Sequence, residues 1–176
     1  MVLQPARTAS QKQQSEEGIV THSTWGNALH TIHAVLRGRE WGIATAESLT
    51  AGLIASTLAR QSGASSYLRG SIVAYNLEAK VKLLSVNADI ARACDCVSQE
   101  VATQMAQGAR SQFGGCECVI AVTGYAERPS RAFYTILCGD KVREGVVEGG
   151  TASRNEVRDL VMSKTLCLLA DMLETR

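Results

Sequence analysis

The chain has 176 residues, of which about 45% are hydrophobic, and its formal net charge is +1. This length suits one globular domain that buries about two-thirds of the surface of the unfolded chain. The basic residues are spread along the sequence, which argues against a nucleic-acid partner because such binding needs a concentrated basic surface. No apolar run reaches the roughly 18 residues of a membrane span, and the N-terminus lacks the apolar segment of a signal peptide. We therefore expect a soluble, cytoplasmic protein with no membrane partner.

The first 22 residues are polar, rich in Gln and Ser, and show no sustained hydrophobic period. This composition predicts a flexible leader at residues 1–22, followed by a single α/β domain at residues 23–176. Apolar residues recur at helical spacing from Trp25 to Leu36, and Gly38 is placed to end that helix. The folded domain is therefore predicted to begin with a helix.

Short apolar stretches then alternate with segments of helical period. We predict strands at 41–46, 71–75, 116–123, 132–138 and 141–148, and helices at 50–60, 76–84, 98–113 and from Ser153 onward. The local signals for element ends are helix caps at Ser98 and Ser153 and a hairpin at 139–140. Strands that alternate with helices favour a sheet covered on both faces. The predicted fold is α/β, a three-layer α/β/α sandwich with a mixed, mostly parallel sheet of about five strands.

The six cysteines fit a reducing compartment, where thiols act as small buried hydrophobic groups. Two Cys-x-Cys pairs, at 94/96 and 116/118, differ from the Cys-x-x-Cys spacing that is usual for zinc. His30 and His33 lie one turn apart on the first helix, where a solvated or partly buried helix face accounts for them. We therefore expect no metal and no cofactor.

The stretch TAESLTAG, residues 45–52, forms the turn between the first strand and the next helix. Ser48 lies at the carboxyl end of that strand, where ligands gather in open sheets of this class. A serine hydroxyl becomes a nucleophile only when a base takes its proton, and all three histidines precede the first strand. Tyr75 ends the second strand and Lys80 follows it, and a lysine in a partly dry pocket has a lowered pKa. The pattern alone is consistent with either a nucleophile or a helix cap at Ser48.

Several motifs follow TAESLTAG along the chain: GASSYLRGSIVAYNLEAKVKLLSV, VSQEVATQMAQGAR and VIAVTGYA. In this order they make residues 25–173 resemble the CinA C-terminal domain family, which includes nicotinamide mononucleotide deamidases. The resemblance implies that Ser48 is the nucleophile and that Tyr75 and Lys80 activate it. It also implies hydrolysis of a pyridine nucleotide, from nicotinamide mononucleotide to nicotinic acid mononucleotide and ammonia, without a metal. Self-association into a homo-oligomer is implied as well.

The first turn of the helix after Ser48 leaves backbone donors unpaired. The N–H groups of Leu49, Thr50 and Ala51 are expected to point at an oxyanion, and they also suit a phosphate. The resemblance implies further substrate contacts around this turn. The full expected substrate-binding set is Glu47, Leu49, Thr50, Ala51, Gly52, Asn76, Thr123, Gly124, Arg128 and Arg154.

The chain departs from the family pattern at a few places. Ala51 replaces a family glycine, a change that costs little if the residue has helical dihedrals. Arg154 and Arg158, by contrast, match the two arginines with which the family opens the last helix. After VIAVTGYA, a long glycine-rich family segment is replaced by residues 127–131 alone. Because of this short loop, two hypotheses about function stay open. The chain is either an amidohydrolase or a catalytically weak or inactive relative with a nucleotide-binding or regulatory role.

Overall fold

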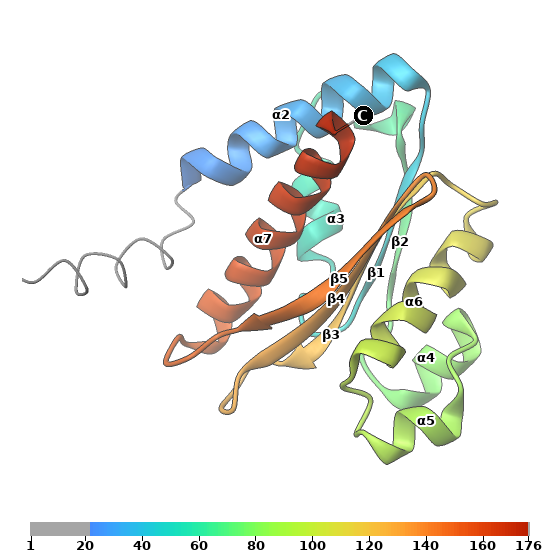
Figure 1. Ribbon diagram of the computed structural model, residues 1–176, viewed down its shortest axis with the longest axis vertical. Helices are drawn as coiled ribbons and strands as arrows, with labels where there is room; N and C mark the ends of the chain where they lie inside the picture. The colour runs from blue at the N-terminus through green and yellow to red at the C-terminus, as the bar shows by residue number, and fades with distance from the viewer. Residues whose placement is uncertain (1–21, 176) are drawn as a thin grey trace, which may run out of the picture.

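The computed structural model describes residues 22–175, which form a five-stranded mixed sheet between two layers of helices (Figure 1). The predicted three-layer α/β/α sandwich is thus confirmed. The predicted leader, apart from His22, lies outside the described residues. The helices are α2 (His22–Arg39), α3 (Leu53–Leu58), η1 (Ala64–Ser66), α4 (Leu77–Leu84), α5 (Ala88–Ala93), α6 (Gln99–Gln112) and α7 (Arg154–Glu174). The strands are β1 (Ile43–Glu47), β2 (Leu68–Val73), β3 (Cys118–Tyr125), β4 (Arg131–Cys138) and β5 (Lys141–Glu148).

The strands follow the order β2-β1-β3-β4-β5 across the sheet. β1 pairs in parallel with both β2 and β3, whereas β4 runs antiparallel to β3 and to β5. Four strands therefore point in one direction and only β4 opposes them. Because β2, β1 and β3 are parallel neighbours, their carboxyl ends meet at one edge of the sheet, which is where binding sites form in such folds.

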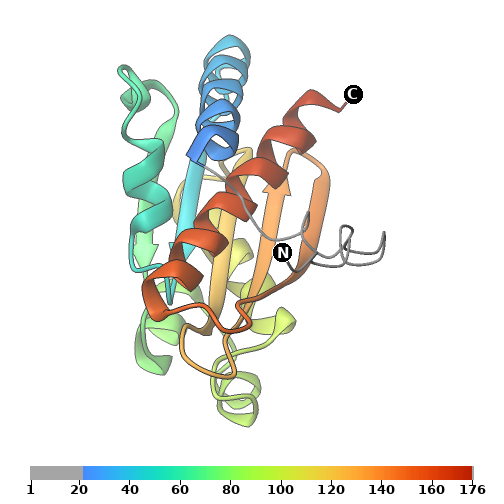
Figure 2. The ribbon, with the colours of Figure 1, turned by 90° about the vertical axis from the view of Figure 1, so that its left-hand side faces the viewer.

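The middle strand of the sheet shows why both faces must be covered. Along β3, Cys118, Ile120 and Val122 belong to a core shared with α2, α3 and α7. The alternate residues Val119 and Ala121 belong to a second core shared with α4, α5 and α6. Successive side chains of a strand point to opposite faces, so a strand that is apolar throughout needs helices on both sides. Figure 2 shows the layer of α2, α3 and α7 crossing in front of the sheet.

Near the carboxyl ends of the parallel strands, the end of β2 and the start of α3 differ from the sequence prediction. β2 ends at Val73, so Tyr75 lies two residues beyond the strand that it was predicted to end. The helix expected from Thr50 begins only at Leu53, because Ala51 and Gly52 have φ angles of 50° and 90°. Left-handed backbone cannot continue a right-handed helix. The first turn of the predicted helix is therefore a tight loop.

Other local predictions agree with the structure. The Ser98 side chain caps α6 by accepting from the Val101 N–H, and the Ser153 N–H donates to the Glu156 carboxylate at 2.7 Å. Two short helices, α5 and the 3₁₀ helix η1, were not predicted, because six and three residues are too few to display a period. Within residues 22–175, no helix combines the length and the apolar character needed to cross a bilayer.

Candidate active site

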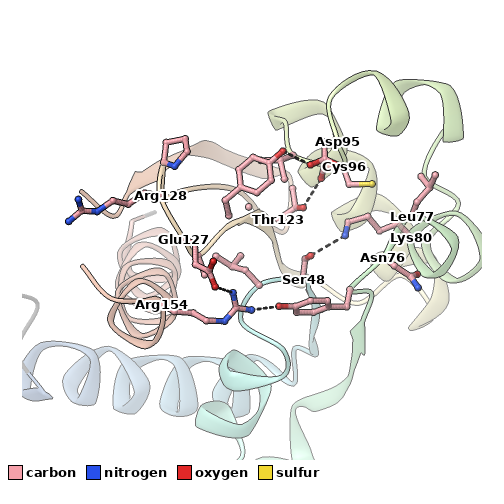
Figure 3. Close-up of a pocket in the computed structure, with 17 residues that line it drawn as sticks. Ser48, Asn76, Leu77, Lys80, Asp95, Cys96, Thr123, Glu127, Arg128 and Arg154 are labelled. Atoms are coloured by element: carbon pink, nitrogen blue, oxygen red, sulfur yellow. Dashed lines mark hydrogen bonds and ion pairs between the residues drawn. The ribbon is translucent and has the colours of Figure 1, made fainter. Parts of the chain in front are cut away.

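A cavity of about 690 Å³ lies at the edge where β1, β2 and β3 end. Its wall is built from five parts of the chain that are distant in sequence: the turn after β1, the segment after β2, the connection between α5 and α6, the end of β3 with its following loop, and the first residue of α7. A volume of this size is typical of small-molecule sites. Figure 3 shows the side chains that line it.

Ser48 and Lys80 form a buried pair at the base of this cavity (Figure 3). Lys80 Nζ lies 3.0 Å from Ser48 Oγ and 2.8 Å from the carbonyl oxygen of Ala74. Only 1% of Lys80 and 7% of Ser48 is exposed. The start of α4 positions the lysine: Asn76 Oδ1 caps the helix by accepting from the Ala79 N–H, which places Lys80 in its first turns.

Burial lowers the pKa of Lys80, and the nearby Cys96 thiol opposes this effect to a lesser extent. Lys80 Nζ donates to both the Ser48 hydroxyl oxygen and the Ala74 carbonyl oxygen. When the amine loses a proton, its lone pair can accept the Ser48 hydroxyl proton in return. The helix-cap reading of Ser48 is wrong, because the N-cap of α3 is Gly52. The Ser48 hydroxyl is instead engaged with a potential base.

The Glu47 side chain satisfies backbone N–H groups at the start of α3, although Gly52 occupies the N-cap position itself. Its carboxylate accepts hydrogen bonds from the N–H groups of Gly52, Ile54 and Ala55 at 2.9, 3.2 and 2.9 Å. The negative charge sits at the helix end that favours anions. Glu47 is 0% exposed and is not among the cavity-lining residues, so its predicted substrate contact is corrected to a structural role beneath the serine turn.

The three expected oxyanion donors differ in what they contact. The Ala51 N–H donates to the Ser48 carbonyl at 3.0 Å, and Ala51 itself has the left-handed φ of 50° rather than helical dihedrals. Within residues 22–175, the N–H groups of Leu49 and Thr50 have no hydrogen-bond acceptor. Thr50 is fully buried and does not line the cavity, whereas Leu49 does. Leu49 is therefore the best placed of the three.

Arg158, on α7, binds the backbone of the turn that follows Ser48. Its guanidinium donates to the carbonyl oxygens of Leu49 and Thr50 at 3.1 and 3.0 Å. A carbonyl shares its peptide plane with the N–H of the next residue, so these two contacts orient the Thr50 and Ala51 N–H groups directly. They restrain the Leu49 N–H only by holding the rest of the turn. The pattern of two arginines in the last helix pointed to this residue, but its partners lie more than one hundred positions earlier, so no local signal identified the contact.

A more exposed wall of the cavity consists of Tyr75, Glu127 and Arg154, and we call it the ionic wall. Arg154 Nη1 lies 3.0 Å from Glu127 Oε1, and its other terminal nitrogen donates to the Tyr75 hydroxyl. The exposed fractions of the Arg154 and Glu127 side chains are 47% and 77%. Tyr75, predicted to activate Ser48, therefore contacts Arg154 instead. Arg128 lines the cavity, but Figure 3 shows its guanidinium directed away from Ser48.

Three further predicted residues line the cavity and also have structural partners. Thr123 Oγ1 donates to the Cys96 carbonyl at 2.7 Å, and Asn76 caps α4. A Cβ atom on Gly124 would lie 2.3 Å from the Arg131 carbonyl oxygen, so only glycine lets β3 and β4 pair closely here. These residues shape the cavity through the backbone as much as through direct contact.

The connection between α5 and α6 supplies lining residues that the sequence did not indicate. Asp95 and Cys96 have left-handed φ angles of 49° and 61°, and the Asp95 carboxylate accepts the Tyr125 hydroxyl at 2.8 Å. Because α5 is too short to show a helical period, the sequence pattern did not indicate this connection. Among the described residues, no group of three or more His, Cys, Asp or Glu side chains is arranged to hold a metal ion.

The fold and the buried pair define an α/β/α protein with a serine–lysine site. The profile of the CinA C-terminal domain matches residues 27–173, and the chain belongs to this family. A CinA-like protein from Mycolicibacterium gilvum is 45% identical over 146 residues, which is 78% of this chain and 34% of that protein. The chain thus spans about one third of the length of this relative.

Solved structures show the same fold. The competence/damage inducible protein from Agrobacterium tumefaciens aligns with a TM-score of 0.74 at 25% identity, over 85% of this chain and 93% of that one. A CinA superfamily protein from Escherichia coli aligns with a TM-score of 0.78 at 23% identity, over 89% and 96% of the two chains. The layered architecture is therefore common to the family.

Proposed function

We propose that this chain is an amidohydrolase that converts nicotinamide mononucleotide and water to nicotinic acid mononucleotide and ammonia. The observation that carries the proposal is the 3.0 Å contact between Lys80 Nζ and Ser48 Oγ at the base of the cavity. A weakly acidic hydroxyl paired with a buried amine of lowered pKa is the arrangement that makes a serine nucleophilic. The specific substrate comes from the family resemblance of the motifs around this pair.

In the first half of the reaction, neutral Lys80 takes the Ser48 proton while Oγ attacks the carboxamide carbon. The carbonyl oxygen becomes an oxyanion, to which the Leu49 N–H donates. Lys80 then returns the proton to the amide nitrogen, the C–N bond breaks and ammonia leaves. An ester between Ser48 and the nicotinoyl group remains.

In the second half, Lys80 accepts a proton from water as the water oxygen attacks the ester carbon. Collapse of the second oxyanion breaks the bond to Ser48 Oγ, which recovers its proton from Lys80. Nicotinic acid mononucleotide leaves and the free site is restored. In both halves Lys80 acts first as a base and then as an acid, so one buried amine is sufficient for proton transfer.

A second candidate is a non-hydrolytic relative that binds a nucleotide. It is favoured by the short loop at 127–131, which brings a carboxylate into the cavity next to Arg154. The same loop lacks the glycines of the family segment, whose backbone N–H groups suit a phosphate. Binding without turnover separates this candidate from the hydrolase.

Ammonia release from nicotinamide mononucleotide tests the proposal. Wild type is expected to release ammonia, whereas Ser48→Ala is expected to lose at least about 10³-fold in rate. Ser56→Ala serves as the matched control, because Ser56 is exposed on the neighbouring helix and lies outside the cavity. Wild-type release at the Ser48→Ala level, with nicotinamide mononucleotide still bound in calorimetry, would establish the non-hydrolytic candidate instead. Self-association stays a prediction, which sedimentation of the purified chain tests.

A further inference from the structure

The ionic wall already contains an anion at the place where a substrate anion is favoured. Arg154 is the first residue of α7, a helix of 21 residues, and the positive end of a helix macrodipole attracts negative charge. The Glu127 carboxylate lies 3.0 Å from the Arg154 guanidinium, and both residues line the cavity that contains Ser48 (Figure 3).

Among the described residues that line the cavity, Arg154 is the cation best placed to bind a phosphate. The other lining cations are Lys80, which is buried against Ser48 and Ala74, and Arg128, whose guanidinium points away from Ser48. Both terminal nitrogens of Arg154 already have partners, Glu127 on one and Tyr75 on the other. A phosphate that binds here must therefore replace Glu127 or share the guanidinium with it.

We propose that Glu127 is an internal competitor for the substrate phosphate at Arg154, and that it sets how strongly the site prefers phosphorylated over unphosphorylated pyridine carboxamides. This inference rests on the proposed function for the identity of the ring and the amide. Its consequence is a site that discriminates weakly between a mononucleotide and the corresponding nucleoside.

The physical reason lies in the charges of the three groups. A carboxylate and a phosphate dianion repel each other when they share one guanidinium, and the competing carboxylate is tethered to the wall, so displacement does not remove it. The Glu127 side chain is 77% exposed, so it can change its conformation, but its covalent attachment keeps the carboxylate near Arg154. The corresponding nucleoside carries the same pyridinium cation but no phosphate, so it meets no such repulsion.

Calorimetric titration on the Ser48→Ala background measures the effect without turnover. The two ligands are nicotinamide mononucleotide and nicotinamide riboside, and the measured quantity is the ratio of their dissociation constants. In Glu127→Gln the ratio is expected to shift by about tenfold in favour of the mononucleotide. Glu148→Gln is the control: its carboxylate lies 2.8 Å from Arg131 in a similarly exposed pair that does not line the cavity.

Arg154→Gln supplies the second arm, because Glu127 has nothing to compete for once the guanidinium is gone. In that background, Glu127→Gln is expected to change the ratio by much less than tenfold. An unchanged ratio in Glu127→Gln, a shift toward the riboside, or failure of both ligands to bind any variant would overturn the inference. If the ratio shifts as expected while the Ser48-intact chain releases no ammonia, the competitor role holds and the hydrolase proposal fails.

Discussion

The base of the cavity and its ionic wall are stabilised by different interactions. Ser48 and Lys80 are almost fully buried, and their contacts are with each other and with the backbone. On the ionic wall, Glu127 and Arg154 are largely exposed and contact each other through long, flexible side chains. Burial shifts a pKa and fixes geometry, whereas an exposed ion pair contributes little to stability and changes easily.

This difference indicates which part of the site can vary without loss of the fold. The reacting groups are attached to the ends of β1 and β2 and to the start of α4, which belong to the packed sheet and its helices. The loop at 127–131 contributes one wall and little of the core. Substitutions of buried residues are therefore expected to have larger effects than substitutions near the surface. Four substitutions, described from the largest expected effect to the smallest, test this expectation.

Lys80→Met removes the base while keeping an unbranched side chain in the buried position. The rate of ammonia release is expected to fall by about 10³-fold, the typical contribution of a general base. Lys82→Met is the matched control, since Lys82 lies on the same helix but is exposed. Residual activity of Lys80→Met within tenfold of wild type would contradict the role of Lys80 as the general base.

Glu47→Gln tests the support beneath the serine turn. The carboxylate accepts three backbone N–H groups at the start of α3, and a neutral amide replaces charge-assisted hydrogen bonds by weaker ones. The free energy of unfolding is expected to fall by about 2 kcal/mol in urea titration. Glu100→Gln, an exposed acidic residue in the first turn of α6, is expected to change it little. Equal losses in the two variants would show that the Glu47 carboxylate does not stabilise the start of α3 in solution.

Arg158→Gln tests the link between the serine turn and α7. Loss of the two carbonyl contacts is expected to loosen the turn that carries the Leu49 donor and to lower kcat about tenfold. KM is expected to stay nearly unchanged, because that donor acts on the oxyanion rather than on bound substrate. Arg158→Lys is expected to recover part of kcat. A rise in KM with unchanged kcat would assign Arg158 to substrate binding instead.

Ala51→Gly has the smallest expected effect and lies on the exposed side of the turn. An alanine with a φ of 50° carries backbone strain that glycine lacks, so the free energy of unfolding is expected to rise by about 0.5 kcal/mol. Ala59→Gly, at an exposed position with a φ of −71°, is the control and is expected to lower stability. Lower stability of Ala51→Gly would mean that the left-handed turn is not populated in solution.

Much of the fold followed from the order of apolar and helical segments, because alternating strands and helices allow few arrangements. Ser48 and Lys80 were identified because Ser48 directly follows β1 and Lys80 lies in the first turns of the helix after β2, and parallel strands end at one edge. The position of Tyr75 was less predictable, since its hydroxyl contact with Arg154 depends on the distant start of α7.

The remaining differences arise from features that sequence patterns do not carry. Glu47 was expected to contact substrate, but whether a carboxylate after a strand faces solvent or a helix end depends on the three-dimensional path of the turn. That path includes a left-handed φ at Ala51, and an alanine in the sequence does not indicate such a conformation. Asp95 and Cys96 reach the cavity through a connection whose short helix shows no period.

The buried lysine also predicts a pH dependence of stability. Because burial lowers the pKa of Lys80 below the ordinary value of 10.5, the unfolded chain binds a proton more readily than the folded protein between these two pKa values. The free energy of unfolding is therefore expected to rise with pH across that window in wild type, relative to Lys80→Met. Urea titrations of both proteins at several pH values measure this difference.

The most direct test of the buried serine–lysine pair is the pH dependence of kcat/KM for ammonia release by the wild-type chain. Protonated Lys80 cannot accept the Ser48 proton, so kcat/KM is expected to rise with pH through a single pKa that lies below 10.5. A kcat/KM that is independent of pH, or that rises only at the ordinary lysine value, would contradict the assignment of Lys80 as the base.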